Sequence, residues 1–406
     1  MARRTIVLFC MSQRGHLQRM RPLISMLAAS GWAAHVFTDR QFKGDVEASA
    51  GRFQDLFAPG SLEAADEVSM PPPFRYVTFA GRFAHDVAAR VRRLRPAIVA
   101  SDSFAIVGHV VARRLGVPHV NICAGHNVHP GRLPELLPSV PATSPSPACL
   151  DAARRLSDEL EIALGDPFSY LCVPSRFLNV YCEPPEFLTP AARQAFEPIA
   201  FFGSVDAAGR EREAGGDCAF PEGPRGALRV YVSLGTVSWR YWPAEVEATL
   251  GLLAEALGAI GDARALLSLG GHADLDDRLA SNLARPNVRV TQYVDQWRAL
   301  KQADVFVTHH GLNSTHEAIY HRVPMLSCPI LWDQSALARR CQELGVALPL
   351  MDAPRAALMP ERLGAALGRL RADREELDRR LGVARGWEER VIAARAEVIR
   401  RIEALA

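Results

Sequence analysis

The chain has 406 residues, of which 49% are hydrophobic and 23% are charged. This composition is typical of a globular protein rather than a disordered one, and the length favours two domains over one core. The formal net charge of +2 gives no electrostatic reason to expect nucleic acid or an acidic membrane as a partner. The eight cysteines form no CxxC pair, which favours buried free thiols over a disulfide framework or a zinc site.

The first half of the chain alternates short apolar segments with helical patterns. Residues 5–11 and 34–38 are predicted strands, and residues 17–29 between them have the spacing of a helix. Two more short apolar segments, residues 97–100 and 117–123, are further strand candidates. This alternation predicts right-handed βαβ units and therefore a parallel sheet.

The N-terminal sequence raises the question of a signal peptide, because Arg3 and Arg4 precede an apolar segment. That segment is short and is followed at once by the polar residues 12–16, with no cleavage pattern of small residues. No segment elsewhere approaches the ~20 apolar residues of a membrane helix. We therefore expect a cytoplasmic protein without stable membrane insertion.

A similar alternation begins again in the second half. Residues 130–147 are rich in proline and serine and predict a long loop of the kind that is often functional. Residues 206–225 are rich in glycine, proline and charge and predict an interdomain linker. Residues 246–260 have helical spacing. Strand candidates in this half are residues 228–234, 265–269, 288–290, 305–308 and 324–328.

The predicted organisation is therefore two doubly wound α/β domains in tandem. We place the first domain at residues 1–210, a linker at 211–226 and the second domain at 227–385. The last segment, from residue 360, is charged and helical and predicts a helix pair, with residues 386–406 packing back toward the first domain. Such sheets bind ligands at the carboxyl ends of their strands.

A strand-to-helix turn at residues 308–317 has features of a diphosphate site. We expect a helix from about Asn313, with Asn313 or Ser314 as its N-cap. The free N–H groups and positive dipole end of a helix N-terminus attract phosphate, and His309 can add a side-chain donor. Glu317 lies one turn further on, where a carboxylate can accept from ribose hydroxyls. The alternative for these residues alone is an ordinary capped turn.

The next predicted strand favours the ligand-binding interpretation. It delivers Asp333 and Gln334 to the same end of the sheet, where a carboxylate and a carboxamide suit sugar hydroxyls. The segment as a whole resembles the signature of family-1 glycosyltransferases of the GT-B fold, including the UDP-glycosyltransferases and those that act on bacterial natural products. The matching residues are His309, Gly311, Asn313, Ser314, Glu317, Val323, Pro324, Asp333 and Gln334.

Other segments resemble the same family. Residues 231–236, ending in Thr236, are similar to the first strand and loop of its donor domain. Tyr293, Val294 and Gln296 are similar to the segment that receives the nucleotide base, where an aromatic ring can stack. Two departures are His310, where the family often has glycine or cysteine, and Arg322, where glycine usually precedes Val-Pro. Arg322 puts the local turn geometry in question.

The resemblance implies a fold of two Rossmann-like domains facing a central cleft and an inverting transfer of a sugar, expected to be a hexose. UDP is the first expectation for the nucleotide and TDP the second. His16 follows the first strand and would be the base that deprotonates the acceptor hydroxyl. Asp102 follows another buried strand and would orient the imidazole and stabilise its charged form. The resemblance assigns both residues the same roles.

The acceptor is expected to be a small, largely apolar or aromatic molecule. Its candidate contacts are His126, Asn127 and Phe83, and the alternative for aromatic residues of this region is the core. The nucleotide sugar is a co-substrate, and no other cofactor and no metal are expected. The one DxD triplet, residues 274–276, does not follow an apolar strand, which favours a solvated helix start. The oligomeric state is not readable from the sequence.

Three other classes of protein were compared with this assignment. A nicotinamide dehydrogenase would need a GxGxxG turn after its first strand, but residues 10–16 contain a single glycine. A sugar-nucleotide epimerase or hydrolase of the same fold would share the diphosphate site. A non-catalytic helper protein would be expected to lose the base or the phosphate residues, and both sets are present.

Overall fold

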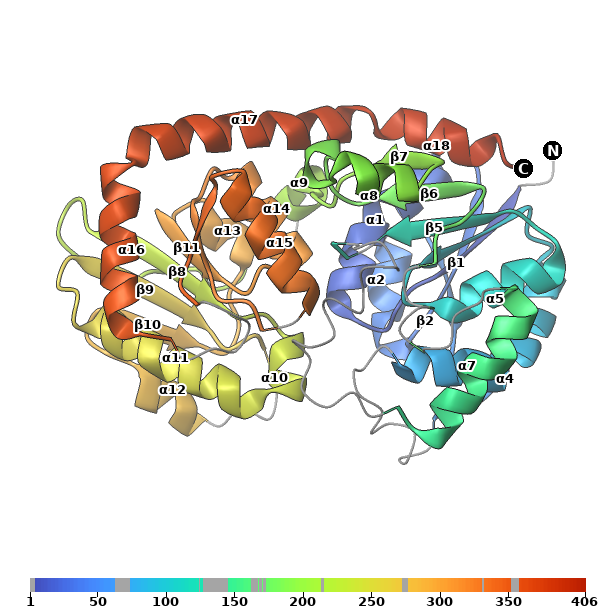
Figure 1. Ribbon diagram of the computed structural model, residues 1–406, viewed down its shortest axis with the longest axis horizontal. Coiled ribbons are helices and arrows are strands. Elements are labelled where there is room, and N and C mark those ends of the chain that lie inside the picture. Colours follow the sequence, from blue (N-terminus) through green and yellow to red (C-terminus); the bar gives the residue numbers. More distant parts are fainter. Residues whose placement is uncertain are drawn as a thin grey trace. The chain divides into compact units, whose positions relative to one another are not determined.

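The computed structural model describes residues 4–62, 74–123, 125–126, 145–161, 167, 170, 173–212, 215–271, 277–330, 332–351 and 358–406. The chain forms two compact units, one of residues 1–206 together with 390–406, the other of residues 207–389. Figure 1 shows that each unit is built around a sheet with helices packed on it. No described helix is long and apolar enough to cross a membrane.

The first unit contains a seven-stranded parallel sheet of order β3-β2-β1-β4-β5-β6-β7. Its strands are β1 (Thr5–Phe9), β2 (Ala33–Thr38), β3 (Arg52–Asp55), β4 (Ile98–Asp102), β5 (His119–Cys123), β6 (Leu178–Tyr181) and β7 (Ile199–Phe201). The central strands are buried along their length, as expected of a parallel sheet covered on both faces. The sheet order changes direction between β1 and β4, which is where doubly wound folds bind ligands.

Helices cover this sheet and connect its parallel strands. They are α1 (Arg14–Ala29), α2 (Lys43–Ala48), α4 (Phe74–Leu94), α5 (Ile106–Leu115), α7 (Pro147–Leu160) and α8 (Pro190–Ala195). Helix α5 lies close to the sheet, because a Cβ on Gly108 would come within 2.5 Å of the Ser101 side chain. Helix α1 begins at Arg14, earlier than the predicted residue 17, so His16 lies in its first turn.

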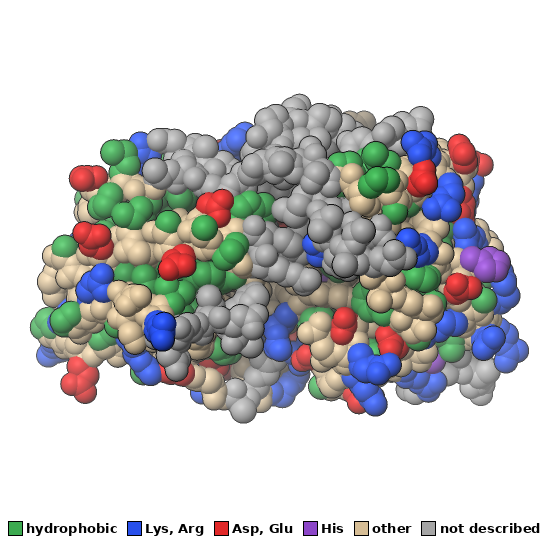
Figure 2. Space-filling model, turned by 90° about the horizontal axis from the view of Figure 1, so that it is seen from below, with side chains coloured by type: hydrophobic (Ala, Val, Ile, Leu, Met, Phe, Trp, Pro, Cys, Tyr) green, Lys and Arg blue, Asp and Glu red, His purple; other side chains and the backbone are tan. Residues whose placement is uncertain are grey.

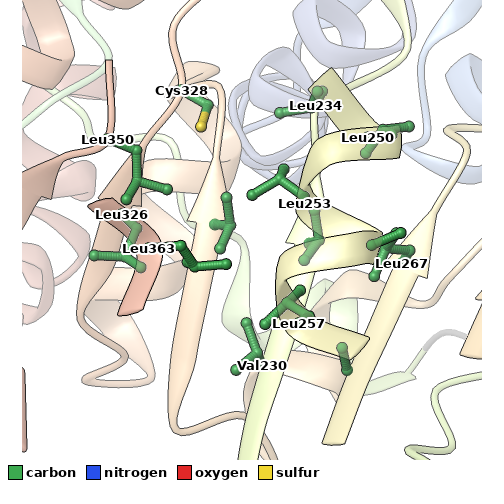
Figure 3. Packing of buried hydrophobic residues seen from close by; sticks show 14 of the residues in the cluster. Val230, Leu234, Leu250, Leu253, Leu257, Leu267, Leu326, Cys328, Leu350 and Leu363 are labelled. Atoms are coloured by element: carbon green, nitrogen blue, oxygen red, sulfur yellow. The ribbon is translucent and has the colours of Figure 1, made fainter. Parts of the chain in front are cut away.

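The second unit contains a six-stranded parallel sheet of order β10-β9-β8-β11-β12-β13. Its strands are β8 (Leu228–Ser233), β9 (Ala263–Ser268), β10 (Val288–Thr291), β11 (Val305–Thr308), β12 (Met325–Ser327) and β13 (Ala347–Pro349). Its helices are α9 (Ala207–Arg212), α10 (Val237–Tyr241), α11 (Pro243–Gly258), α12 (Asp277–Leu283), α13 (Gln296–Leu300), α14 (Leu312–Tyr320), α15 (Trp332–Glu343) and α16 (Pro360–Ala372). Leucine and valine side chains from β8, β9, α11 and α16 form its core (Figure 3).

Two helices end the chain, α17 (Arg374–Ala393) and α18 (Arg395–Glu403). The segment from residue 360 therefore forms three helices rather than the predicted pair, because the chain turns once more near Ala394. Arg395 donates to the carbonyl oxygens of Phe202 and Val205 at 2.9 and 2.7 Å, and the Trp32 indole donates to Glu403 at 3.1 Å. These contacts attach α18 to the first unit.

The segment predicted as a linker is partly structured. Residues 207–212 form the short helix α9, and Asp217 pairs with Arg289 of β10 at 2.6 Å. The backbone N–H of Asp295 also donates to the carbonyl of Asp217 at 2.9 Å. This part of the chain thus packs on the second unit, which its glycine-rich composition did not reveal. Figure 2 shows charged side chains of both signs interspersed with hydrophobic ones over the visible surface.

Candidate functional site

A histidine and an aspartate meet at the carboxyl edge of the first sheet. His16 comes from the first turn of α1, and Asp102 is the last residue of β4. The His16 Nδ1 lies 2.5 Å from Asp102 Oδ2, and Asp102 Oδ1 accepts from the backbone N–H of Phe104 at 2.9 Å. Asp102 is fully buried, whereas 14% of the His16 side chain is exposed. The sequence predicted both residues, and the structure brings them together.

One aromatic side chain packs on His16, and others lie in the same unit. The ring of Phe104 lies edge-on to the imidazole, with 5.4 Å between ring centroids. The Tyr76 hydroxyl accepts from the backbone N–H of Ser12, in the loop that leads to His16. Phe83 is half-buried and packs on the core residue Phe79. No contact in the structure assigns Phe83 to an acceptor, so this role stays a prediction.

His126 lies beyond the end of β5 on the same sheet edge. Its Nδ1 is 2.9 Å from Oε2 of Glu183, a fully buried residue just after β6. Asn127, the other predicted acceptor contact of this segment, lies outside the described residues. Sequence reasoning missed Glu183 because the segment before it, residues 178–181, was not predicted to be a strand. The signal was present, since an acid directly after a buried strand is the pattern that identified Asp102.

The N-terminus of α14 lies at the carboxyl edge of the second sheet. Gly311 is the N-cap, with φ −60° and ψ 140°, and no side chain caps this helix. The expectation of Asn313 or Ser314 as the N-cap is wrong, because the helix begins earlier and places both residues inside its first turn. Ser314 instead donates to the Gln296 side chain at 3.2 Å. The first N–H groups of α14 therefore have no side-chain oxygen from the cap position.

His309 stands between the ends of β8 and β11. Its Nδ1 lies 3.4 Å from the carbonyl oxygen of Ser233. A Cβ on Gly235, which has φ +77°, or on Gly311 would come within 2.4 Å of its Nε2, so only glycine fits at either position. Burial lowers the pKa of His309 to about 4. The free ring is therefore neutral at pH 7.

An exposed tyrosine and a hydrogen-bonded pair lie at the end of β10. Tyr293 leaves 49% of its surface exposed, which suits stacking on a base, whereas the Val294 side chain is buried. Gln296 Nε2 donates to Glu317 Oε2 at 2.7 Å. Arg210 of α9 approaches the other oxygen of Glu317 at 3.6 Å. The sequence predicted Tyr293, Gln296 and Glu317, but Arg210 lay in the segment assigned to the linker.

The remaining predicted donor residues lie at neighbouring strand ends. Thr236 is exposed at the N-cap of α10, directly after Gly235. Asp333 is half-buried in the first turn of α15. Gln334 is buried, and its Oε1 accepts from the backbone N–H of Ile330 at 3.0 Å. Because this oxygen is already used, Gln334 would offer a sugar its N–H donors.

The two departures from the family pattern share one backbone feature. His310 and Arg322 both have φ +59°, in the left-handed region where glycine is the usual residue. The turn at Arg322, which the sequence put in question, therefore has the backbone conformation that glycine usually adopts. His310 is buried, with Nδ1 3.2 Å from Thr315 Oγ1 and Nε2 2.8 Å from Ser327 Oγ. Burial, and then the neighbouring His309, lower its pKa to about 3.

Neither a metal-binding cluster nor a disulfide occurs among the residues that the structure describes. No group of three or more histidine, cysteine, aspartate or glutamate side chains that could hold a metal ion occurs in the described part of the chain. The DxD triplet at residues 274–276 lies outside that part. Within it, the cysteines are free thiols, nearly all of them buried.

Comparison with solved structures identifies the class of fold. A structure titled the glycotransferase of kitacinnamycin is 25% identical with a TM-score of 0.76, covering 99% of this chain and 100% of that one. CalG4, the calicheamicin glycosyltransferase, is 22% identical with a TM-score of 0.73 over the full length of both chains. VinC, solved in complex with DTDP, is 20% identical with a TM-score of 0.68, covering 98% of this chain and 100% of that one. The fold is GT-B, and the class is that of GT-B glycosyltransferases.

Sequence comparison then places the chain within that class. Residues 209–366 match the profile of the UDP-glucoronosyl and UDP-glucosyl transferases. The uncharacterized UDP-glucosyltransferase YdhE of Bacillus subtilis is 33% identical, over 28% of this chain and 27% of its own length. The NDP-glycosyltransferase YjiC of the same organism is 25% identical, over 70% of this chain and 67% of its own. The chain thus spans only part of several relatives: it matches 27% of the length of YdhE, and 58% and 26% of the lengths of two further glucosyltransferases.

Proposed function

We propose that the protein transfers a sugar, expected to be a hexose, from a nucleoside diphosphate donor to a hydroxyl group of a small, largely apolar acceptor. The observation that carries the proposal is the His16–Asp102 pair at the carboxyl edge of the first sheet. The Asp102 carboxylate can only accept at Nδ1, so the ring proton lies on Nδ1 and Nε2 keeps its lone pair. Among the described residues His16 Nε2 has no hydrogen-bond partner.

His16 would act as the general base. Its Nε2 takes the proton of the acceptor hydroxyl while the oxygen attacks the anomeric carbon, the bond to the diphosphate breaks and the configuration inverts. Asp102 stabilises the imidazolium that forms and keeps the ring oriented. The Phe104 ring beside His16, with the half-buried Tyr76 and Phe83 of the same unit, would provide an apolar surface for the acceptor.

The second unit would receive the donor. Charge builds on the leaving diphosphate, and the N-terminal N–H groups of α14, with its dipole, would stabilise that charge without a metal ion. Hydroxyls of Thr236 and Ser314 and the amide of Asn313 can add donors. Tyr293 would stack on the base, Glu317 would accept from the ribose, and Asp333 and Gln334 would bind the sugar. We place UDP before TDP as the nucleotide.

The test is a panel of donors and acceptors with the purified protein, with released nucleotide and product mass as readouts. We expect one donor to give a product heavier by one sugar. We expect His16→Ala to lose about 10²–10⁴-fold in rate, as for a general base, while its binding of UDP stays unchanged. Asp102→Asn should lose activity without losing UDP binding.

The outcomes separate the alternatives. Release of sugar without any acceptor product would favour a sugar-nucleotide hydrolase. UDP binding without turnover of any donor would favour a non-catalytic helper. The absence of both binding and turnover would overturn the proposal.

A further inference from the structure

The first unit carries a second imidazole–carboxylate pair on the sheet edge that holds His16. The Nδ1 of His126 lies 2.9 Å from Oε2 of Glu183, and the Tyr181 hydroxyl donates to the same oxygen at 2.6 Å. Glu183 is fully buried, whereas 10% of the His126 side chain is exposed. The pair thus has its carboxylate inside the protein and part of its imidazole at the surface.

The surrounding groups determine which ring nitrogen is available. Burial raises the pKa of Tyr181 well above its usual value, and the Glu183 charge raises it further, so the phenol stays neutral and donates. An ionised Glu183 can only accept from His126, which places the ring proton on Nδ1. Within the described part of the chain, Nε2 of His126 has no hydrogen-bond partner. His126 and His16 therefore present the same chemical group, an oriented Nε2 lone pair.

The two pairs are separated by a distance that the sheet determines. Asp102 ends β4 and Glu183 follows β6, with β5 between these strands. Two strand spacings separate β4 from β6 by roughly 10 Å across the sheet. Asp102 is in register with Ile122 of β5 and, through it, with Val180 of β6, so Glu183 lies three residues further along the strand direction.

A second histidine–glutamate pair, in the second unit, is an example of a pair with a purely structural role. His316 and Glu388 lie 2.5 Å apart, and both side chains are fully buried. His316 makes further contacts besides this one. Such a pair needs no ligand. His126 differs, because 10% of its side chain is exposed and its Nε2 has no hydrogen-bond partner among the described residues. An oriented imidazole of this kind is the arrangement expected of a group that binds a hydroxyl.

We propose that His126, oriented by Glu183, accepts a hydrogen bond from a second hydroxyl group of the acceptor. The preferred acceptors then carry two hydroxyls, one at His16 and one at His126, separated by a distance on the order of 10 Å. This inference rests on the proposed function, since it assumes that the first unit binds the acceptor. His126 is a specificity-determining residue in this reading, and Glu183 is a positioning residue.

The test uses two probes that differ by one distal hydroxyl, 4,4′-biphenol and 4-phenylphenol. The donor is the one identified in the panel. We expect the wild type to favour the biphenol by about 5–50-fold in kcat/KM, because bound 4-phenylphenol would leave the His126 nitrogen without a hydrogen bond. His126→Ala should bring the ratio of the two kcat/KM values close to one. Glu183→Gln should lower the ratio through the acceptor KM rather than through kcat.

Controls separate this inference from misfolding and from the proposed function. His85→Ala changes an exposed histidine of α4 and should keep the wild-type ratio. UDP binding checks that each variant is folded, and a variant that fails this check is replaced by His126→Asn. If other acceptors are glycosylated but the wild type does not favour the biphenol, the inference is wrong and the function stands. If the ratio survives in a folded His126 variant, the inference is also wrong. If no acceptor is glycosylated at all, the proposed function fails first.

Discussion

His309 has two possible hydrogen-bonding partners at the proposed phosphate site, the Ser233 carbonyl and a bound diphosphate. Its contact with the Ser233 carbonyl uses a proton on Nδ1, whereas an anion near Nε2 needs a proton there. A neutral ring carries only one of these protons. Since burial lowers the pKa of the free ring to about 4, a bound diphosphate would favour uptake of the second proton.

Binding of the donor should therefore depend on pH. A bound diphosphate raises the His309 pKa above its free value of about 4. Affinity is then constant above the raised pKa and increases as the pH falls through it. We expect UDP-glucose to bind about three- to tenfold more tightly at pH 5 than at pH 7, since one pKa unit corresponds to a factor of ten. Calorimetry should show proton uptake, and His309→Gln should abolish both effects. Affinity that is flat or weaker at pH 5 would contradict the prediction.

At the scale of elements, the turn between α14 and β12 has a left-handed backbone conformation at a residue that is not glycine. Arg322 has φ +59°, although left-handed backbone costs a residue with a side chain roughly 1–2 kcal/mol. The guanidinium donates to the carbonyl of Asp378 in α17 at 3.0 Å. This exposed hydrogen bond offsets only part of the free-energy cost of the left-handed backbone.

Substitution of Arg322 should therefore have an unusual sign. Arg322→Gly is expected to raise the free energy of unfolding by up to about 1 kcal/mol, because relief of the backbone outweighs the added chain entropy. Arg322→Val should lower it by about 1–2 kcal/mol, since a β-branched residue tolerates this φ poorly. Arg339→Gly, in the exposed part of α15, should cost about 1 kcal/mol. Urea denaturation checks all three, and equal effects of Arg322→Gly and Arg339→Gly would refute the assignment.

At the scale of the whole molecule, α17 carries residues of both compact units. Within the second unit its Glu388 pairs with His316 of α14, and both side chains are fully buried. From Arg390 the helix belongs to the first unit, where Arg390 pairs with Glu186 and Val391 packs over Gly203. The His316–Glu388 pair thus connects α17, which has residues in both units, to α14, the helix proposed to bind the diphosphate.

Removing one member of this pair should be costly. Glu388→Ala leaves the His316 ring buried without its partner, and we expect a loss of about 3–5 kcal/mol in the free energy of unfolding. Glu389→Ala, one residue further on, removes an exposed ion pair with Arg385 and should cost at most about 1 kcal/mol. Replacing both His316 and Glu388 by leucine should recover part of the loss. Similar values for Glu388→Ala and Glu389→Ala in urea denaturation would show that the buried pair does not stabilise the fold.

The sequence by itself determined the class of fold and the parts of the site that depend on local patterns. Buried strands followed by polar residues identified Asp102, and His309, Gly311 and Glu317 came from one continuous motif. The positions of these residues could be predicted because strand and helix periods are local, and because parallel strands bring their carboxyl ends to one edge. Their roles in binding and catalysis stay predictions.

Only the tertiary structure decided which side chains meet. His16 and Asp102 are 86 residues apart, and His126 and Glu183 are 57 apart. Their pairing depends on the order of strands in the sheet, which no local pattern encodes. The same holds for Arg210 beside Glu317, and for Arg322 in a backbone region that glycine usually occupies. Local periodicity specifies which residues reach the sheet edge, whereas strand order and packing specify their neighbours there.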